Sequence, residues 1–528
     1  MPRKGTNDLF ELVHSMTPSE KRYFQIRNQR SGKGGQAKYM CLFEVLNSME
    51  IYDRKAVLAC LPDIKPEQLP NLKSRLYKTL LQNLTEIQSN DQRSRIHLGQ
   101  VTGHLETLYV KGLFDQCLKT ATQIKKLAYE REHYEVLPEI LLWEQKAYGR
   151  ILINADILAS KYARVTKELE HISGILTRLA AVNVIRHRVF SLFSNQGRVV
   201  RDRTRAEKIR EVARQGEELL YDAQTFKEER TIRHMLLQAY MMLADCEHLL
   251  NHCRKIGELF EAVPSRKHMH IVEYIQFLNT YAIALNMSER YEETLQITKV
   301  TQEIHTSGEF TLTPPQEALV FDCSVFHQLE VYIRTGQFEK GVRLIPELEK
   351  GLERHQPHMN PVNIHSKHYR IALALFGAGN FRESLNWVNN ILNSPQLFRK
   401  DIQSGVRLLN LILHFELHNL SLVEYAVKST YRYLKNMQSL YRTETALLHF
   451  LRTLQDIRDR TMLHSAFQQL ADRLTQLFAE DPLERHALPY FDTIAWLESK
   501  VTGKSLSECI QKKRSEKQGP MAETPALP

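Results

Sequence analysis

HYRIALALFGAGNFRESLNWVNNILNSP, residues 368–395, contains two segments with helical apolar periodicity that meet at GNFRESL, residues 379–385. Related motifs occur at three other places: GLFDQCL at 112–118, ERYEETL at 289–295 and GQFEKGV at 336–342. In each copy an aromatic residue is followed three positions later by a small one, and a small residue lets one helix lie close to its neighbour. The pairs are Phe114 with Cys117, Tyr291 with Thr294, Phe338 with Gly341, and Phe381 with Ser384. The pattern predicts a series of helical hairpins.

The spacing of the hairpin tips indicates an irregular array. An aromatic or leucine residue marks each tip at Leu249, Tyr291, Phe338, Phe381 and Leu420, which gives spacings of 42, 47, 43 and 39 residues. A regular tetratricopeptide (TPR) repeat has about 34 residues. We therefore expect longer helices or loops between some of the tips.

The segment at 368–395 resembles TPR-type repeats. Ala372 stands at the small position of the first helix, Gly379 at the turn and Pro395 near the end of the second helix. The resemblance implies an all-α fold, an irregular TPR-like right-handed superhelical solenoid of helical hairpins.

Three other stretches resemble an uncharacterised family of helical-repeat proteins from Bacteroidota. They are MTPSEKRYF at 16–24, LHFELHNLSLVEYAVKSTYRYLK at 413–435 and YFDTIAWLESK at 490–500. The resemblance suggests a bacterial helical-repeat protein and implies no activity.

Length and composition favour a repeat array in a reducing compartment. A chain of 528 residues exceeds the ~250–300 residues at which single cores stop growing. The seven cysteines are odd in number and scattered, which favours the cytoplasm over a disulfide framework. No run approaches the ~18 apolar residues of a membrane span, and no signal peptide is apparent, so we expect no membrane insertion.

Charge and periodicity suggest four segments. Residues 1–95 contain 16 Lys or Arg against 10 Asp or Glu, a net charge of +6, and form a basic helical segment that is either a cap or a small domain. Within it, Thr17-Pro18-Ser19-Glu20 predicts a capping box. The solenoid is expected at 96–480, a C-terminal capping helix with Trp496 at 481–510, and a disordered tail at 511–528.

Two clusters of metal-ligating residue types have a spacing that argues against metal binding. Two ligands of the first set are adjacent in sequence, and Pro357 and Pro361 stiffen the loop within the second. The sets are Cys246, His248, His252 and Cys253, then His355, His358, His365 and His368. The sequence also lacks the nucleophile elbow, HExxH, Rossmann, P-loop and kinase motifs. We expect no metal, no cofactor and no enzymatic activity.

Basic stretches leave a nucleic-acid alternative open. Residues 198–214 hold seven basic and three acidic side chains. On a helix, Arg198, Arg201, Arg205 and Lys208 would form a stripe, which we interpret as a solvated, partly ion-paired face. The helix expected at 67–88 carries basic residues that suggest a helix-turn-helix-like unit, although apolar residues on the same helix favour a cap. The basic residues are Lys73, Arg75 and Lys78, and the apolar ones Leu72, Leu76 and Leu80.

The concave groove of a solenoid is its usual binding surface, because the first helices of the hairpins line it. Their predicted partner-binding residues are Asn279, Ile283, Asn286, Phe326, Glu330, Arg334, Tyr369, Arg370, Leu373 and Phe376. Inter-repeat core is the alternative for the apolar members. We expect a non-enzymatic adaptor that binds a peptide or protein, with Arg334 and Arg370 on a partner carboxylate. The runner-up is a nucleic-acid-binding regulator with a basic N-terminal segment and a solenoid sensor body. The sequence does not indicate an oligomeric state.

Overall fold

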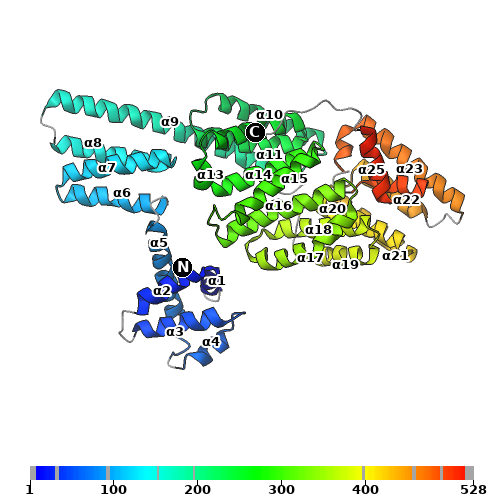
Figure 1. Ribbon diagram of the computed structural model, residues 1–528, viewed down its shortest axis with the longest axis horizontal. Helices are drawn as coiled ribbons and strands as arrows, with labels where there is room; N and C mark the ends of the chain where they lie inside the picture. The colour runs from blue at the N-terminus through cyan, green and yellow to red at the C-terminus, as the bar shows by residue number, and fades with distance from the viewer. Residues whose placement is uncertain are drawn as a thin grey trace. The chain divides into compact units, whose positions relative to one another are not determined.

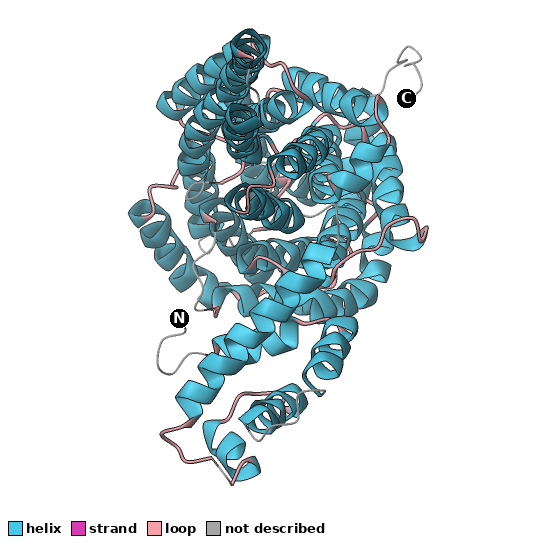
Figure 2. Cartoon of the chain, turned by 90° about the vertical axis from the view of Figure 1, so that its left-hand side faces the viewer, coloured by secondary structure: helices cyan, strands magenta, loops and turns pink. Residues whose placement is uncertain are grey.

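The computed structural model describes residues 7–29, 35–62, 64–90, 95–151, 154–193, 197–394, 399–454, 459–487 and 491–517. In these ranges every regular element is a helix, and Figure 2 shows helices joined by loops without a strand. The all-α prediction is therefore confirmed. Across the described ranges, no helix is both long enough and apolar enough to cross a membrane.

Contacts between Cα atoms divide the chain into two compact units, Met1–Leu176 and Thr177–Pro528. Five helices at the start of the first unit enclose an apolar core that includes Phe24, Phe43 and Leu76. They are α1 (Asp8–Ser15), α2 (Pro18–Gln29), α3 (Gly35–Ser48), α4 (Arg54–Cys60) and α5 (Leu69–Asn90). The predicted capping box is confirmed, because the Thr17 N–H donates to Glu20 Oε2 over 2.7 Å and the Glu20 N–H to Thr17 Oγ1 over 3.3 Å.

The rest of the first unit is also helical. They are α6 (Arg95–Val110), α7 (Phe114–Glu130), η1 (Tyr134–Val136), α8 (Leu137–Ile151) and α9 (Ala155–Phe193), which runs on into the second unit. Buried Glu144 of α8 accepts from Lys125 of α7 over 2.8 Å and from Arg164 of α9 over 2.9 Å. This cluster joins three helices.

The second unit is built from helices that pack in sequential pairs. The first helices of successive hairpins, α14, α16, α18 and α20, also contact one another, as Figure 1 shows. Its helices are α10 (Arg203–Tyr221), α11 (Phe226–Leu243), α12 (Cys246–Glu261), α13 (Ser265–Met269), α14 (Ile271–Met287), α15 (Tyr291–Thr306), α16 (Pro314–Arg334), α17 (Phe338–His355), η2 (Gln356–His358), α18 (Pro361–Gly377), α19 (Phe381–Leu392), α20 (Lys400–Glu416), α21 (Leu420–Asn436), α22 (Arg442–Thr453), α23 (Arg460–Glu480), η4 (Pro482–Ala487), α24 (Thr493–Thr502) and α25 (Leu506–Lys517).

The predicted tips are turns between helices, each with a left-handed residue two positions before the second helix. Gly336 has φ +68° and Gly379 φ +81°. In the second of these turns the Asn380 N–H donates to Leu375 O over 2.9 Å, which completes a Schellman motif. The marker Leu249 is three residues late, because the matching position after left-handed Ala244 is Cys246.

The small residues after the tips bring paired helices close together. Ser384 Oγ donates to Ala372 O on the preceding helix over 2.7 Å. At Gly341, an added Cβ would lie 3.1 Å from Leu329 Cδ1 and 3.4 Å from Ala374 Cβ. The interpretation of the aromatic–small pairs is confirmed at these two hairpins.

The prediction of a basic stripe in residues 198–214 is wrong. The Asp202 carboxylate accepts the Arg205 N–H over 2.8 Å and caps α10, so the helix begins only at Arg203. Arg198 and Arg201 therefore precede the helix and cannot share a face with Lys208.

The structure also differs from the expected C-terminal tail. Residues 511–517 belong to α25, where Leu506, Cys509 and Ile510 at helical spacing contact the rest of the unit. Residues 518–528 lie outside the described residues. The predicted boundaries at 95 and 480 remain predictions.

Candidate partner-binding face

The first helices of the hairpins are covered on nearly all sides. In α16 every residue from Ala318 to Val331 is buried or half-buried, and in α18 the same holds from His365 to Phe376. A helix enclosed in this way belongs to an interior. We call the side that carries Asn279 of α14, Glu330 and Arg334 of α16, Arg370 of α18 and Asp401 of α20 the inner face. Other segments of the same unit cover much of it.

The apolar residues predicted to bind a partner lie in the core. Each is at most 9% exposed and belongs to an apolar cluster of the second unit. They are Ile283, Phe326, Tyr369, Leu373 and Phe376. In this structure they pack between helices, which was the alternative interpretation for the apolar positions.

Three of the polar predicted residues form one ion-pair cluster. Glu330 accepts from Arg334 Nε over 2.9 Å and from Arg370 Nε over 2.5 Å. Burial alone would raise the pKa of Glu330, but the two guanidinium groups outweigh it and lower the pKa to about 2. One carboxylate between two guanidinium groups leaves the cluster with a net charge of +1.

Beside this cluster lies a histidine that the sequence analysis did not single out. His327 Nε2 donates to Asn279 Oδ1 over 2.7 Å. Burial and the nearby cations Arg370, Arg198 and Lys367 lower the pKa of His327 to about 3, so the ring is neutral at pH 7.

Asn286, another predicted residue, ends α14 with its side-chain amide buried. Neither Oδ1 nor Nδ2 has a hydrogen-bond partner among the residues that the structure describes. Buried amides are usually paired, so the Asn286 side chain has hydrogen-bonding capacity that the described residues do not use.

Residues 197–202, which precede α10 and which we call the linker, contact the inner face at Asp401. The Arg198 N–H donates to Asp401 Oδ2 over 3.0 Å and the Val200 N–H to Met242 O over 2.8 Å. His486 Nδ1 donates to Val200 O over 2.7 Å. Gly197 is required at the start, since its φ is +119° and an added Cβ would lie 2.7 Å from Asp401 Cβ. The segment 197–202 thus joins α11, α20 and η4.

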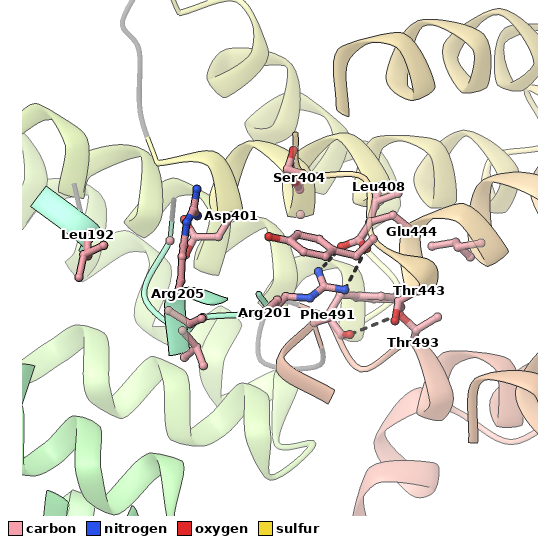
Figure 3. Close-up of a pocket in the computed structure, with 18 residues that line it drawn as sticks. Leu192, Arg201, Arg205, Asp401, Ser404, Leu408, Thr443, Glu444, Phe491 and Thr493 are labelled. Carbon is pink, nitrogen blue, oxygen red and sulfur yellow. Dashed lines mark hydrogen bonds and ion pairs between the residues drawn. The ribbon is translucent and has the colours of Figure 1, made fainter. Parts of the chain in front are cut away.

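Arg201 anchors this linker. Figure 3 shows its guanidinium directed at Glu444 of α22, with which it makes two hydrogen bonds. It also donates to Glu484 Oε2 over 2.7 Å and lies 4.1 Å from the centre of the Tyr441 ring. Glu484 in turn accepts from Thr443 Oγ1 over 2.7 Å. A bidentate carboxylate, a second carboxylate and an aromatic face bind Arg201, whose buried Nε has no hydrogen-bond partner among the described residues.

A small cavity of about 60 Å³ lies beside Arg201 and is also lined by Arg205, Ser404, Tyr441 and Phe491. Its volume suits a few water molecules. Arg205 has no ion-pair partner in the described part of the chain. The lining contains no nucleophile activated by a neighbouring base, so we assign it no catalytic chemistry.

In the two Cys/His clusters considered as metal sites, side chains pack against or hydrogen-bond to neighbouring helices. Within the described residues, no three His, Cys, Asp or Glu side chains lie close enough to hold a metal ion. His252 Nε2 lies 2.9 Å from Glu217 Oε1, and its ring stacks on Tyr240. Burial raises the pKa of the Cys253 thiol. His368 packs against Trp387, and burial lowers its pKa to about 4.

In the first unit, α5 buries its apolar residues. Leu76 and Leu80 lie in the core. Lys73 Nζ lies 4.6 Å from the centre of the Tyr52 ring, and Arg75 lies 5.6 Å from that of Tyr39. Lys78 is exposed. The helix covers its own core and also presents cations at the surface.

No protein-family model matches this chain, and no curated protein shows significant similarity to it. We therefore infer its function from the contacts of the inner face.

Proposed function

We propose that this chain is a cytoplasmic, non-enzymatic scaffold whose TPR-like superhelix binds a peptide of a partner protein along the inner face. The observation that carries the proposal is that the second unit holds a non-helical segment of its own chain, residues 197–202, which reaches the inner face at Asp401. All seven cysteines are free thiols, as suits a reducing compartment.

The linker is held by the contacts that peptide-binding proteins use. Val200 is bound through both its N–H and its C=O, and these main-chain bonds hold an extended peptide whatever its side chains. Arg201 adds specificity through Glu444 and Glu484, and arginine is enriched among the residues that dominate binding energies. The second unit therefore has, next to the inner face, groups that can hold a peptide.

The cluster around Glu330 supports an acidic contact with the partner. Its net charge of +1 attracts a carboxylate, and the Arg334 side chain is 30% exposed. A partner carboxylate would bind Arg334 and Arg370 while Glu330 keeps both guanidinium groups in position.

Site-directed photo-crosslinking in the native lysate tests the proposal. A photoreactive amino acid at position 334 should crosslink one discrete protein, whereas the same group at exposed Lys350 on α17 should not. With the purified partner, Arg334→Ala plus Arg370→Ala should weaken binding at least ~10-fold, and Lys350→Ala should leave it unchanged. Equal crosslinking at both positions, or full affinity in the double variant, would refute binding at the inner face.

The exposed Lys78 and the neighbouring Arg75 on α5 support a second candidate, a nucleic-acid-binding regulator. Repeating the photo-crosslinking with nuclease and at high salt distinguishes the two candidate functions. Binding to phosphates weakens steeply with salt, whereas a peptide bound by main-chain hydrogen bonds and apolar contacts is much less affected.

A further inference from the structure

The last helix, α25, docks on the turn between α16 and α17. Cys509 and Ile510 are at most 8% exposed and pack with Phe338 and Ala495. Ser507 Oγ donates to Gly336 O over 2.5 Å. At this turn the apolar contact of α25 consists of Leu506, Cys509 and Ile510.

The surface beneath α25 favours a cation. Arg514 lies 4.9 Å from the centre of the Tyr291 ring and 3.7 Å from Glu292. Gly336 O follows the C-terminus of α16, where the helix dipole is negative. The segment 506–517 has four basic and two acidic side chains, a net charge of +2, and so complements this surface.

α25 also contains its own start signal. The Ser505 N–H donates to Glu508 Oε2 over 2.8 Å, and the Glu508 N–H donates to Ser505 Oγ over 3.2 Å. This capping box pairs backbone N–H groups of the first turn with side chains of the same turn. The link to α24 is short and turns at Gly503, which has φ +67°. α25 also packs on α24, where Lys513 Nζ lies 3.4 Å from Asp492 Oδ1 and 3.5 Å from Glu498 Oε2.

We infer that the surface formed by Tyr291, Glu292, Gly336 and Phe338 is a docking site for a short basic amphipathic helix of a partner protein, and that α25 occupies it as an intramolecular ligand. The partner helix would have the spacing of α25: adjacent apolar residues as at 509 and 510, a hydroxyl or amide two or three positions earlier, and an arginine four positions later. The inference rests on the proposed function and specifies the kind of partner.

The first experiment uses the thiols of the full chain as reporters. Ile510→Glu should undock α25 and speed alkylation of Cys509 at least ~10-fold, because a charge replaces a buried side chain. Cys253 and Cys323, which lie in other clusters, should stay protected. Lys512→Glu, at an exposed position of α25, is the matched control. If Cys253 and Cys323 also become reactive, α25 is part of the core and the inference fails.

The second experiment offers a labelled peptide of residues 503–517 to the full-length proteins. It should bind the Ile510→Glu chain at least ~10-fold more tightly than the wild-type chain, because the site is vacant only in the variant. A peptide that itself carries Ile510→Glu is the control and should bind neither protein. Equal binding of the wild-type peptide to both proteins, or to neither, would overturn the inference. Crosslinking at position 334 is read independently, so failure of the proposed function and failure of this docking site are distinguishable.

Discussion

At the residue scale, Arg201 is the side chain whose loss should cost most. Arg201→Ala leaves the carboxylates of Glu444 and Glu484 buried without their cation. Breaking a buried ion pair on one side typically costs about 3–5 kcal/mol, so we expect the free energy of unfolding of the second unit to fall by that amount. Urea denaturation measures the change. Arg203→Ala, at a 77% exposed side chain, should leave stability unchanged. A similar small effect for both variants would mean that Arg201 is not an anchor.

His327 gives the inner face a defined response to acid. Its pKa is about 3 in the folded chain against 6.5 when unfolded, so below pH 6.5 the unfolded chain takes up a proton that the folded chain does not. The contribution of neutral His327 to the free energy of unfolding is fully present above pH 6.5. Below that pH it falls by about 1.4 kcal/mol per pH unit. Between pH 6.5 and 5 we expect His327→Gln to lose about 2 kcal/mol less than the wild type, measured by urea midpoints. An equal loss in both proteins would contradict the buried, neutral state of His327.

Sequence reasoning placed Glu330, Arg334 and Arg370 on one face, and the structure brings these three together because α16 and α18 are neighbouring first helices. The anchoring role of Arg201 was not predicted, because the partners of this residue lie 243 and 283 positions away. A local signal did exist, since Asp202 is a good N-cap residue and would have excluded Arg201 from the helix. Nothing local could have identified Glu444 or Glu484.

At the scale of single elements, the small residue after each tip sets the distance between paired helices. Gly341→Leu would press on Leu329 and Ala374, and overpacking of this kind typically costs about 1–3 kcal/mol. We expect a lower urea midpoint for this variant and no change for Glu339→Leu, an exposed position of the same helix. Full stability of Gly341→Leu would show that α16 and α17 can separate without loss.

The hairpins could be predicted because four of the tips carry a residue that adopts positive φ, an aromatic and a small side chain within seven positions. The terminal helix α25 could not be predicted in full from the sequence. Its second half, residues 511–517, has no apolar residue, so only its polar contacts in the structure, among them those of Arg514 with Tyr291 and Glu292 and of Lys513 with Asp492, show that it is part of the fold.

At the scale of the molecule, the second unit is tied together by segments distant in sequence. The linker 197–202 bonds to Met242, Asp401, Glu444 and His486, which come from elements spread through this unit. The sequence predicted which helices pair and gave no sign of these cross-links, because bonds between distant segments leave no periodic trace.

Hydrogen exchange should show the effect of these ties. In Arg201→Ala we expect faster amide exchange in the linker, in the first turn of α22 and in η4, because all three share this side chain or its partners. Exchange in residues 7–151 should be unchanged. If the faster exchange stayed within residues 197–202, the linker would not stabilise α22 and η4.

These ties also set an order of events during synthesis. Arg201 leaves the ribosome 243 residues before Glu444, which at ~5–20 residues per second is a delay of roughly 12–50 s. Within that time α14 and α16 are completed before the elements that later cover the inner face, and Arg201 has neither Glu444 nor Glu484 to pair with. Nascent chains of this protein should therefore need chaperone protection between the translation of residues 201 and 444, and slowing translation should lengthen that need.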